Sequence, residues 1–270
     1  METGVGPAHL DAARQILNDA AAPVPRADIW RPVLAASQAL LLVVFLAVLF
    51  AAMRGAGMLG PAALRWMLPA SFVMMALLPW LLLTPDGRRA IGLRRPASWL
   101  MLAPTMLAGA GAALACGALG LLLFGHSPDH WFVTVAASYR GMMDTNTFST
   151  LMLHGVFTLP ALLFSPIGEE IFFRGILQRA LEERFSTRLS TAQECAAFGL
   201  VHLLHHGLFS DASGWSMRPL SGALWVVAMF LTAGLFAAIR HRSGSLFPAM
   251  AAHAAFNAAM NTFIFGLLWR

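Results

Sequence analysis

Residues 33–53 read VLAASQALLLVVFLAVLFAAM, a stretch of 21 residues that carries no charged side chain. An α-helix of this length is about 30 Å long, which matches the hydrocarbon thickness of a lipid bilayer. The stretch therefore predicts a helix that crosses a membrane, and it makes lipid the solvent in which this chain folds.

The composition of the whole chain agrees with that interpretation. Hydrophobic residues make up 58% of the 270 residues and charged residues 11%, with a mean hydropathy of +0.68. Soluble domains carry about 25% charged residues, and at this length they still need a polar exterior. Soluble, disordered and collagen-like classes are therefore excluded. All 18 basic residues are arginines that lie between apolar stretches, which favours an anionic membrane surface and not a nucleic acid as partner.

Six further stretches predict helices of the same bundle. They are residues 61–83, 98–124, about 148–168, about 190–206, 219–239 and 245–268. The expected fold class is an all-α, polytopic membrane bundle of seven transmembrane helices, or eight if residues 131–143 or 166–184 enter the membrane separately. Residues 1–32 are expected to be a cytoplasmic tail, in which residues 10–16 can form an amphipathic helix. Residues 33–270 are expected to form one transmembrane domain.

With seven spans, the arginines divide unequally between the two sides of the membrane. The side of the N-terminal tail receives 12 arginines and the other side 5, while Arg174 belongs to neither. The positive-inside rule then places the N terminus in the cytoplasm and the C terminus outside. The five arginines on the outer side are Arg54, Arg65, Arg140, Arg218 and Arg270. Arginine without lysine is typical of GC-rich coding, which favours the inner membrane of a bacterium.

Acidic side chains inside a span are costly, and residues 165–175, SPIGEEIFFRG, contain two adjacent ones. Neighbouring residues on a helix point about 100° apart, so Glu169 and Glu170 are not expected to share a face. Glu170 and Arg174 are four residues apart and can pair. Glu169 then has no local partner, which is typical of a desolvated general base. The alternative is a pair of acids favoured by the dipole at a helix end, which explains Glu170 better than Glu169.

Two later spans add polar side chains. His202 follows Phe198 by four residues in the fifth span, and His253 and Asn257 share one face of the last span. Each could be a hydrogen bond between helices and nothing more. Together with Glu169 they predict a buried polar cluster drawn from three helices. In it, Glu169 and His202 can polarise a water, while His253 and Asn257 can donate to a developing oxyanion.

These residues resemble, in order, the three motifs of a known family. The motifs are Glu169-Glu170-x-x-x-Arg174, Phe198-x-x-x-His202 and His253-x-x-x-Asn257. They resemble those of the CPBP family, which comprises CAAX proteases and bacteriocin-processing enzymes. The resemblance covers roughly residues 150 to 268, and a protease-like core is expected at about 148–268.

The resemblance implies an all-helical membrane fold with a polar cavity open toward the cytoplasm. It also implies an intramembrane glutamic endopeptidase that needs no metal and no cofactor. By motif position, Glu169 would be the base that activates water with the help of His202, and His253 and Asn257 would form the oxyanion hole. The supporting residues implied in the same way are Glu170, Arg174 and Phe198. The expected substrate is a membrane-associated protein or a precursor peptide.

Two alternatives remain open. Glu169, His202 and His253 could converge on zinc, although the chain has no His-Glu-x-x-His motif. The chain could also be a non-catalytic scaffold, an immunity protein or a transporter, although no inverted repeat supports transport. The two cysteines, Cys116 and Cys195, lie in or beside apolar spans and are expected to be buried free thiols.

Overall fold

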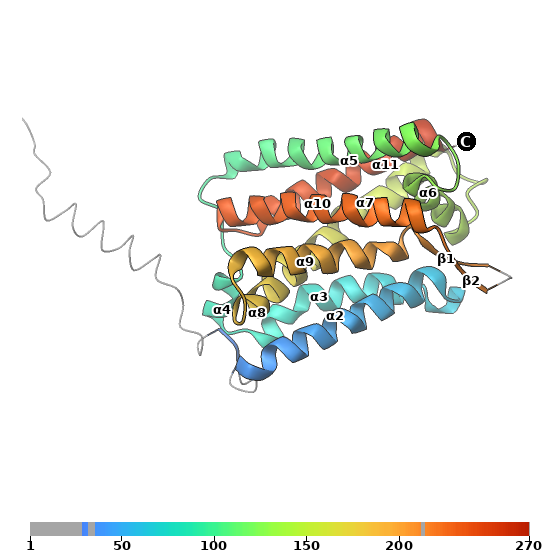
Figure 1. The fold of residues 1–270 in the computed structure, drawn as a ribbon. Helices are drawn as coiled ribbons and strands as arrows, with labels where there is room; N and C mark the ends of the chain where they lie inside the picture. The colour runs from blue at the N-terminus through green and yellow to red at the C-terminus, as the bar shows by residue number, and fades with distance from the viewer. Residues whose placement is uncertain (1–28, 32–35, 212–213, 270) are drawn as a thin grey trace, which may run out of the picture.

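The computed structural model describes residues 29–31, 36–211 and 214–269, and the described chain is helical except for one hairpin (Figure 1). The amphipathic helix expected at residues 10–16 lies outside the described residues. The helices are α2 (Ala36–Leu59), η2 (Ala62–Leu64), α3 (Met67–Leu82), α4 (Pro85–Ala90), η3 (Trp99–Met101), α5 (Leu102–Phe124), α6 (Trp131–Met142), α7 (Thr150–Glu169), η4 (Glu170–Leu177), α8 (Gln178–Glu182), α9 (Thr187–Val201), η5 (His202–Leu204), α10 (Pro219–Ser243), α11 (Phe247–Phe263) and η6 (Ile264–Leu268). The hairpin pairs β1 (Leu208–Asp211) with β2 (Gly214–Met217) in antiparallel register.

Six helices of the described chain are long and apolar enough to cross a membrane, which confirms an all-helical integral membrane protein. They are Gln38–Leu59, Ala62–Leu82, Trp99–Phe124, Thr150–Glu182, Pro219–Ser243 and Phe247–Leu268. They correspond to six of the seven predicted spans. The remaining prediction, at about 190–206, falls on α9, whose 15 residues rise about 22 Å. Figure 1 shows α9 alongside the long helices, so it is part of the bundle although it is short.

Neither candidate for an eighth span is a separate member of these six long helices. Residues 166–184 continue α7 without a break through η4 into α8, so that they prolong one long span. Residues 131–143 form α6, a helix of 12 residues at one end of the bundle (Figure 1).

The two ends of the bundle differ in what they carry. One end holds α4, α8 and the turn between α10 and α11, where Arg94 Nε donates to the Gly244 carbonyl at 2.7 Å. The other end holds α6, the β1–β2 hairpin and the C-terminal end of the described chain (Figure 1). We call these the α4/α8 end and the α6/hairpin end.

Small residues bring the helices close together where the bundle is tightest. Gly109 of α5 is buried against the carbonyl oxygen of Ala252 on α11, and a Cβ at this position would overlap that oxygen. Gly168 of α7 meets the backbone of Phe72 on α3 in the same way. Because lipid offers no hydrophobic force between helices, such close backbone contacts are a main source of their association.

Replacing Gly109 with valine is therefore expected to force α5 and α11 apart and to destabilise the bundle by about 1–3 kcal/mol. The measurement is the midpoint of thermal unfolding of the detergent-solubilised protein. Gly111→Val is the matched control, because a Cβ at Gly111 meets nothing within 4 Å. Equal midpoints for the two variants would contradict the packing role of Gly109.

Candidate active site

The four predicted catalytic side chains surround one cavity of about 270 Å³ inside the bundle. Glu169, His202, His253 and Asn257 all contribute to its wall, although they come from α7, η5 and α11. The rest of the wall is mostly apolar. It includes Leu68, Phe72, Val135, Phe157, Phe164, Met229, Phe236, Phe256 and Met260. The cavity thus combines a few polar groups with an apolar lining, as binding sites commonly do.

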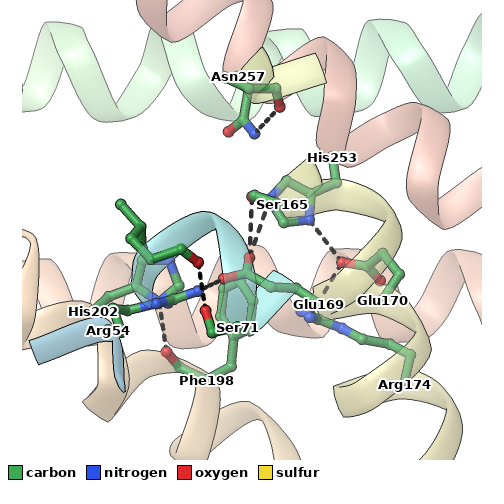
Figure 2. A network of polar contacts seen from close by, with 12 residues as sticks. Arg54, Ser71, Ser165, Glu169, Glu170, Arg174, Phe198, His202, His253 and Asn257 are labelled. Atoms are coloured by element: carbon green, nitrogen blue, oxygen red, sulfur yellow. Dashed lines mark hydrogen bonds and ion pairs between the residues drawn. The ribbon is translucent and has the colours of Figure 1, made fainter. Parts of the chain in front are cut away.

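Glu169 is buried, as expected, but it is not unpaired. It forms an ion pair with Arg54 of α2, and Ser165 Oγ donates to Glu169 Oε2 at 3.3 Å (Figure 2). The prediction of an unpartnered carboxylate was therefore wrong. It overlooked Ser165, four residues earlier on α7, and it did not consider other helices, whereas Arg54 lies 115 positions earlier in the chain.

Arg54 itself was wrongly placed among the arginines outside the membrane. Its side chain is 1% exposed, and its guanidinium lies over the ring of Phe72, 5.1 Å from the ring centroid. One nitrogen, Nη1, has no hydrogen-bond partner among the described residues. Arg54 directly follows an apolar stretch, so hydropathy assigned it to the end of a span. The fold instead brings it to the cavity carboxylate.

His253 lies between the two adjacent glutamates. Its Nδ1 is 2.8 Å from Glu170 Oε1, and its Nε2 is 3.6 Å from Glu169 Oε2 and 3.5 Å from Ser165 Oγ (Figure 2). The ring stacks on Phe236 with the centroids 5.0 Å apart. Glu169 and Glu170 point in different directions from the helix, and the His253 ring lies between them, with one nitrogen toward each carboxyl group. An ionised Glu170 makes Nδ1 the donor and leaves Nε2 directed at Glu169.

The predicted pair of Glu170 and Arg174 is present at 3.2 Å, and it belongs to a larger network. Arg174 Nε also lies 3.4 Å from Oε1 of Glu194, a fully buried residue of α9. The Arg174 guanidinium covers the ring of Phe198 at 4.2 Å, which explains the aromatic residue of the second motif. Glu194 was missed, although an acid within a predicted span was itself a signal.

His202 ends α9 and is oriented by the backbone. Its Nδ1 lies 2.6 Å from the Phe198 carbonyl oxygen, so Nδ1 is the donor and Nε2 is free to accept. The Trp225 indole donates to the His202 carbonyl at 3.1 Å, which fixes the turn from the other side. The side chain lines the same cavity as Glu169.

Asn257 and Asn261 tie α11 to its neighbours. Asn257 Nδ2 donates to the Ala161 carbonyl at 2.8 Å, and this amide has a second N–H. Asn261 accepts from the Tyr139 hydroxyl at 2.9 Å and donates to Thr158 at 3.1 Å. Burial raises the pKa of Tyr139, which lies on α6, to about 12, so its hydroxyl stays protonated. Of the two asparagines, only Asn257 lines the cavity.

The part of the chain that the structure describes holds no group of three or more histidine, cysteine, aspartate or glutamate residues arranged to bind a metal. The zinc alternative therefore gains no support from the geometry. Cys116 and Cys195 are free thiols as expected, but only Cys195 is buried, whereas Cys116 is half-buried.

Comparison with known families supports the family resemblance that the three motifs indicated. Residues 150–259 match the family model described as type II CAAX prenyl endopeptidase Rce1-like, and this segment contains all three motifs. The resemblance inferred from the motifs is thus confirmed for this part of the chain. Comparisons with curated proteins and with solved structures give no match.

Proposed function

We propose that this integral membrane protein, whose residues 150–259 match the type II CAAX prenyl endopeptidase family, hydrolyses a peptide bond of a membrane-associated protein or precursor peptide. The observation that carries the proposal is the buried carboxylate of Glu169 on the cavity wall, held by Arg54 and facing His253. A carboxylate on the wall of a cavity that has room for water and a peptide segment has the position that a general base requires.

In the proposed reaction, Glu169 and His202 hold a water in the cavity. The bare Nε2 of His202 accepts one hydrogen of that water, and Glu169 takes the other as the water oxygen attacks the scissile carbonyl carbon. Glu169 then passes its proton to the leaving nitrogen as the carbon–nitrogen bond breaks. The products are a carboxylic acid and an amine, and the enzyme returns to its starting state.

The proposed oxyanion site is formed by His253 and Asn257. Asn257 offers its second N–H, and His253 offers Nε2 when that nitrogen carries a proton. The carboxylate of Glu170 stabilises a positive charge on His253 through Nδ1, and Arg174 holds Glu170 in place. The pair of Glu170 and Arg174 therefore acts on the site by positioning a histidine.

Replacing Asn257 with alanine is expected to lower kcat by about 10²–10³-fold, the usual effect of losing one oxyanion donor. Asn261→Ala is the matched control, because Asn261 is also buried on α11 and bonds to α7 but does not line the cavity. Its kcat should stay within a few fold of the wild type. Equal losses of kcat in both variants would assign Asn257 a structural role only.

Dialysis against a strong chelator is expected to leave the activity unchanged, since the described residues provide no metal site. The measurement is peptide hydrolysis before and after dialysis, with and without added zinc. Activity that is lost on dialysis and restored by zinc would instead support the zinc alternative.

Mass spectrometry of membrane peptides tests the function directly. Membranes from cells that express the wild type or the Glu169→Gln variant are compared, and a peptide that stays uncut only in the variant identifies both substrate and cleavage site. Identical peptide profiles would favour a non-catalytic scaffold. We further propose that the chain resides in the inner membrane of a bacterium with its N terminus in the cytoplasm, as the arginine distribution indicates.

A further inference from the structure

The cavity extends from the candidate catalytic residues toward only one end of the bundle. On α7 the lining residues, such as Phe157 and Ser165, all precede Glu169, and α7 begins next to α6. On α11 the lining residues from Phe256 to Met260 follow His253, toward the C-terminal end of the described chain. That end lies beside α6 in Figure 1. The cavity therefore occupies the half of the bundle toward the α6/hairpin end.

The mouth of the cavity lies in this same half. Its exposed lining residues come from α3, α6 and α7, and include Met142 at 37% and Phe164 at 44% exposure. Pro69 and Pro160 are also exposed. Neither α4, nor α8, nor the turn between α10 and α11 contributes a lining residue. The exposed part of the cavity wall thus lies where the start of α3, the end of α6 and the middle of α7 come together.

The two ends carry very different numbers of arginines. Among the described residues outside the buried network, ten lie at the α4/α8 end and three at the α6/hairpin end. The ten are Arg31, Arg88, Arg89, Arg94, Arg95, Arg179, Arg184, Arg188, Arg240 and Arg242, and the three are Arg65, Arg140 and Arg218. Because Arg54 is buried, the asymmetry is greater than the sequence tally suggested. The positive-inside rule assigns the α4/α8 end to the cytoplasm.

We propose that the cavity opens to the extracytoplasmic side of the membrane and that its substrates are apolar peptide segments of exported, membrane-anchored proteins. The proposal rests on the proposed peptidase function, whose substrate class it narrows. It follows from two observations together, namely a mouth at the α6/hairpin end and an arginine excess at the opposite end. The family resemblance implied a cavity open to the cytoplasm, and the proposal reverses this. The mouth and the arginine-rich α4/α8 end lie at opposite ends of the bundle, so that the two cannot both face the cytoplasm.

The apolar lining determines which peptide fits. A peptide segment next to a membrane anchor can enter where the start of α3, the end of α6 and the middle of α7 meet, and its apolar side chains then stay out of water. Its scissile carbonyl then meets Glu169 and His253 at the inner end of the cavity. Strongly charged peptides are excluded by the cost of moving a charge into this lining.

Labelling of single cysteines in intact cells tests the orientation. Cys116 and Cys195 are first replaced with alanine, and one cysteine is then introduced at Asn146 in the loop after α6, at Ser138 on the cavity wall, or at Arg89 on α4. Cells are treated with a membrane-impermeant sulfonated maleimide, and the remaining thiols are counted after lysis with a permeable one. Arg89 is the matched control, because its side chain is 72% exposed at the opposite end.

We expect Asn146→Cys and Ser138→Cys to be blocked in intact cells and Arg89→Cys to react only after lysis. The reverse pattern would overturn the proposal. If Asn146→Cys is blocked but Ser138→Cys reacts from neither side, the cavity is closed at this end and the proposal fails as well. The labelling result does not require the protein to cleave a peptide, so it tests the orientation independently of the proposed peptidase activity. If the orientation holds and no peptide is cut, only the peptidase function fails.

Discussion

Replacing Glu169 with glutamine is expected to lower the rate of peptide hydrolysis by about 10⁴-fold, at the upper end of what a general base contributes. Glutamine keeps the size of the side chain and can still accept from Ser165, but it cannot take a proton from water. The measurement is kcat on the substrate that mass spectrometry identifies, with purified protein in detergent or nanodiscs.

The variant has a side effect that needs its own control. It leaves Arg54 buried without its counter-ion, and breaking a buried ion pair costs about 3–5 kcal/mol of stability. The double variant Glu169→Gln with Arg54→Gln removes both charges and should recover most of the thermal stability. If its activity stays lost, the loss comes from the chemistry and not from unfolding. Activity that returns with stability would rule out Glu169 as the base.

Replacing Arg54 with glutamine is expected to reduce hydrolysis by at least about 10²-fold, although Arg54 lies outside the segment matched to the family. A carboxylate buried in an apolar site takes up a proton when its counter-ion is removed, and a protonated Glu169 cannot act as a base. The same substitution should lower the stability by about 3–5 kcal/mol.

Arg54→Lys distinguishes charge from packing. Lysine keeps the positive charge next to Glu169. The hydrolytic activity of Arg54→Lys should therefore lie within about tenfold of the wild type, well above that of Arg54→Gln. Arg65→Gln serves as the control for the loss of an exposed arginine at the same end of the bundle, and it should change neither activity nor stability. A rise in activity in Arg54→Gln would identify Arg54 as an inhibitory partner of Glu169.

The arginines fall into two groups with different roles in the proposed orientation. In that orientation the arginines at the α4/α8 end would face the cytoplasm, whereas the two buried ones, Arg54 and Arg174, pair with carboxylates inside the bundle. The buried network contains the carboxylates of Glu169, Glu170 and Glu194 against these two guanidinium groups. His253 lies against this network, with Nδ1 2.8 Å from Glu170 Oε1.

What the sequence determined by itself rests on short-range regularities. Runs of apolar residues such as 33–53 identify membrane helices, because a helix needs about 20 mostly apolar residues to cross the hydrocarbon core. The spacing of Glu170 and Arg174 predicted their pairing, because residues four apart lie on one face of a helix. The three motifs, taken in order, pointed to the family that residues 150–259 match.

Only the tertiary structure decided which charged side chains meet Glu169 and its neighbours. Its partner Arg54 is 115 positions away, Glu194 reaches Arg174 from α9, and His253 joins both glutamates from α11. The packing of several helices sets these contacts, and no helical period links positions so far apart. The place of the cavity, at the end opposite the arginine excess, likewise depends on which halves of α3, α6, α7 and α11 face one another. Hydropathy and spacing describe one helix at a time, whereas the site is a property of their arrangement.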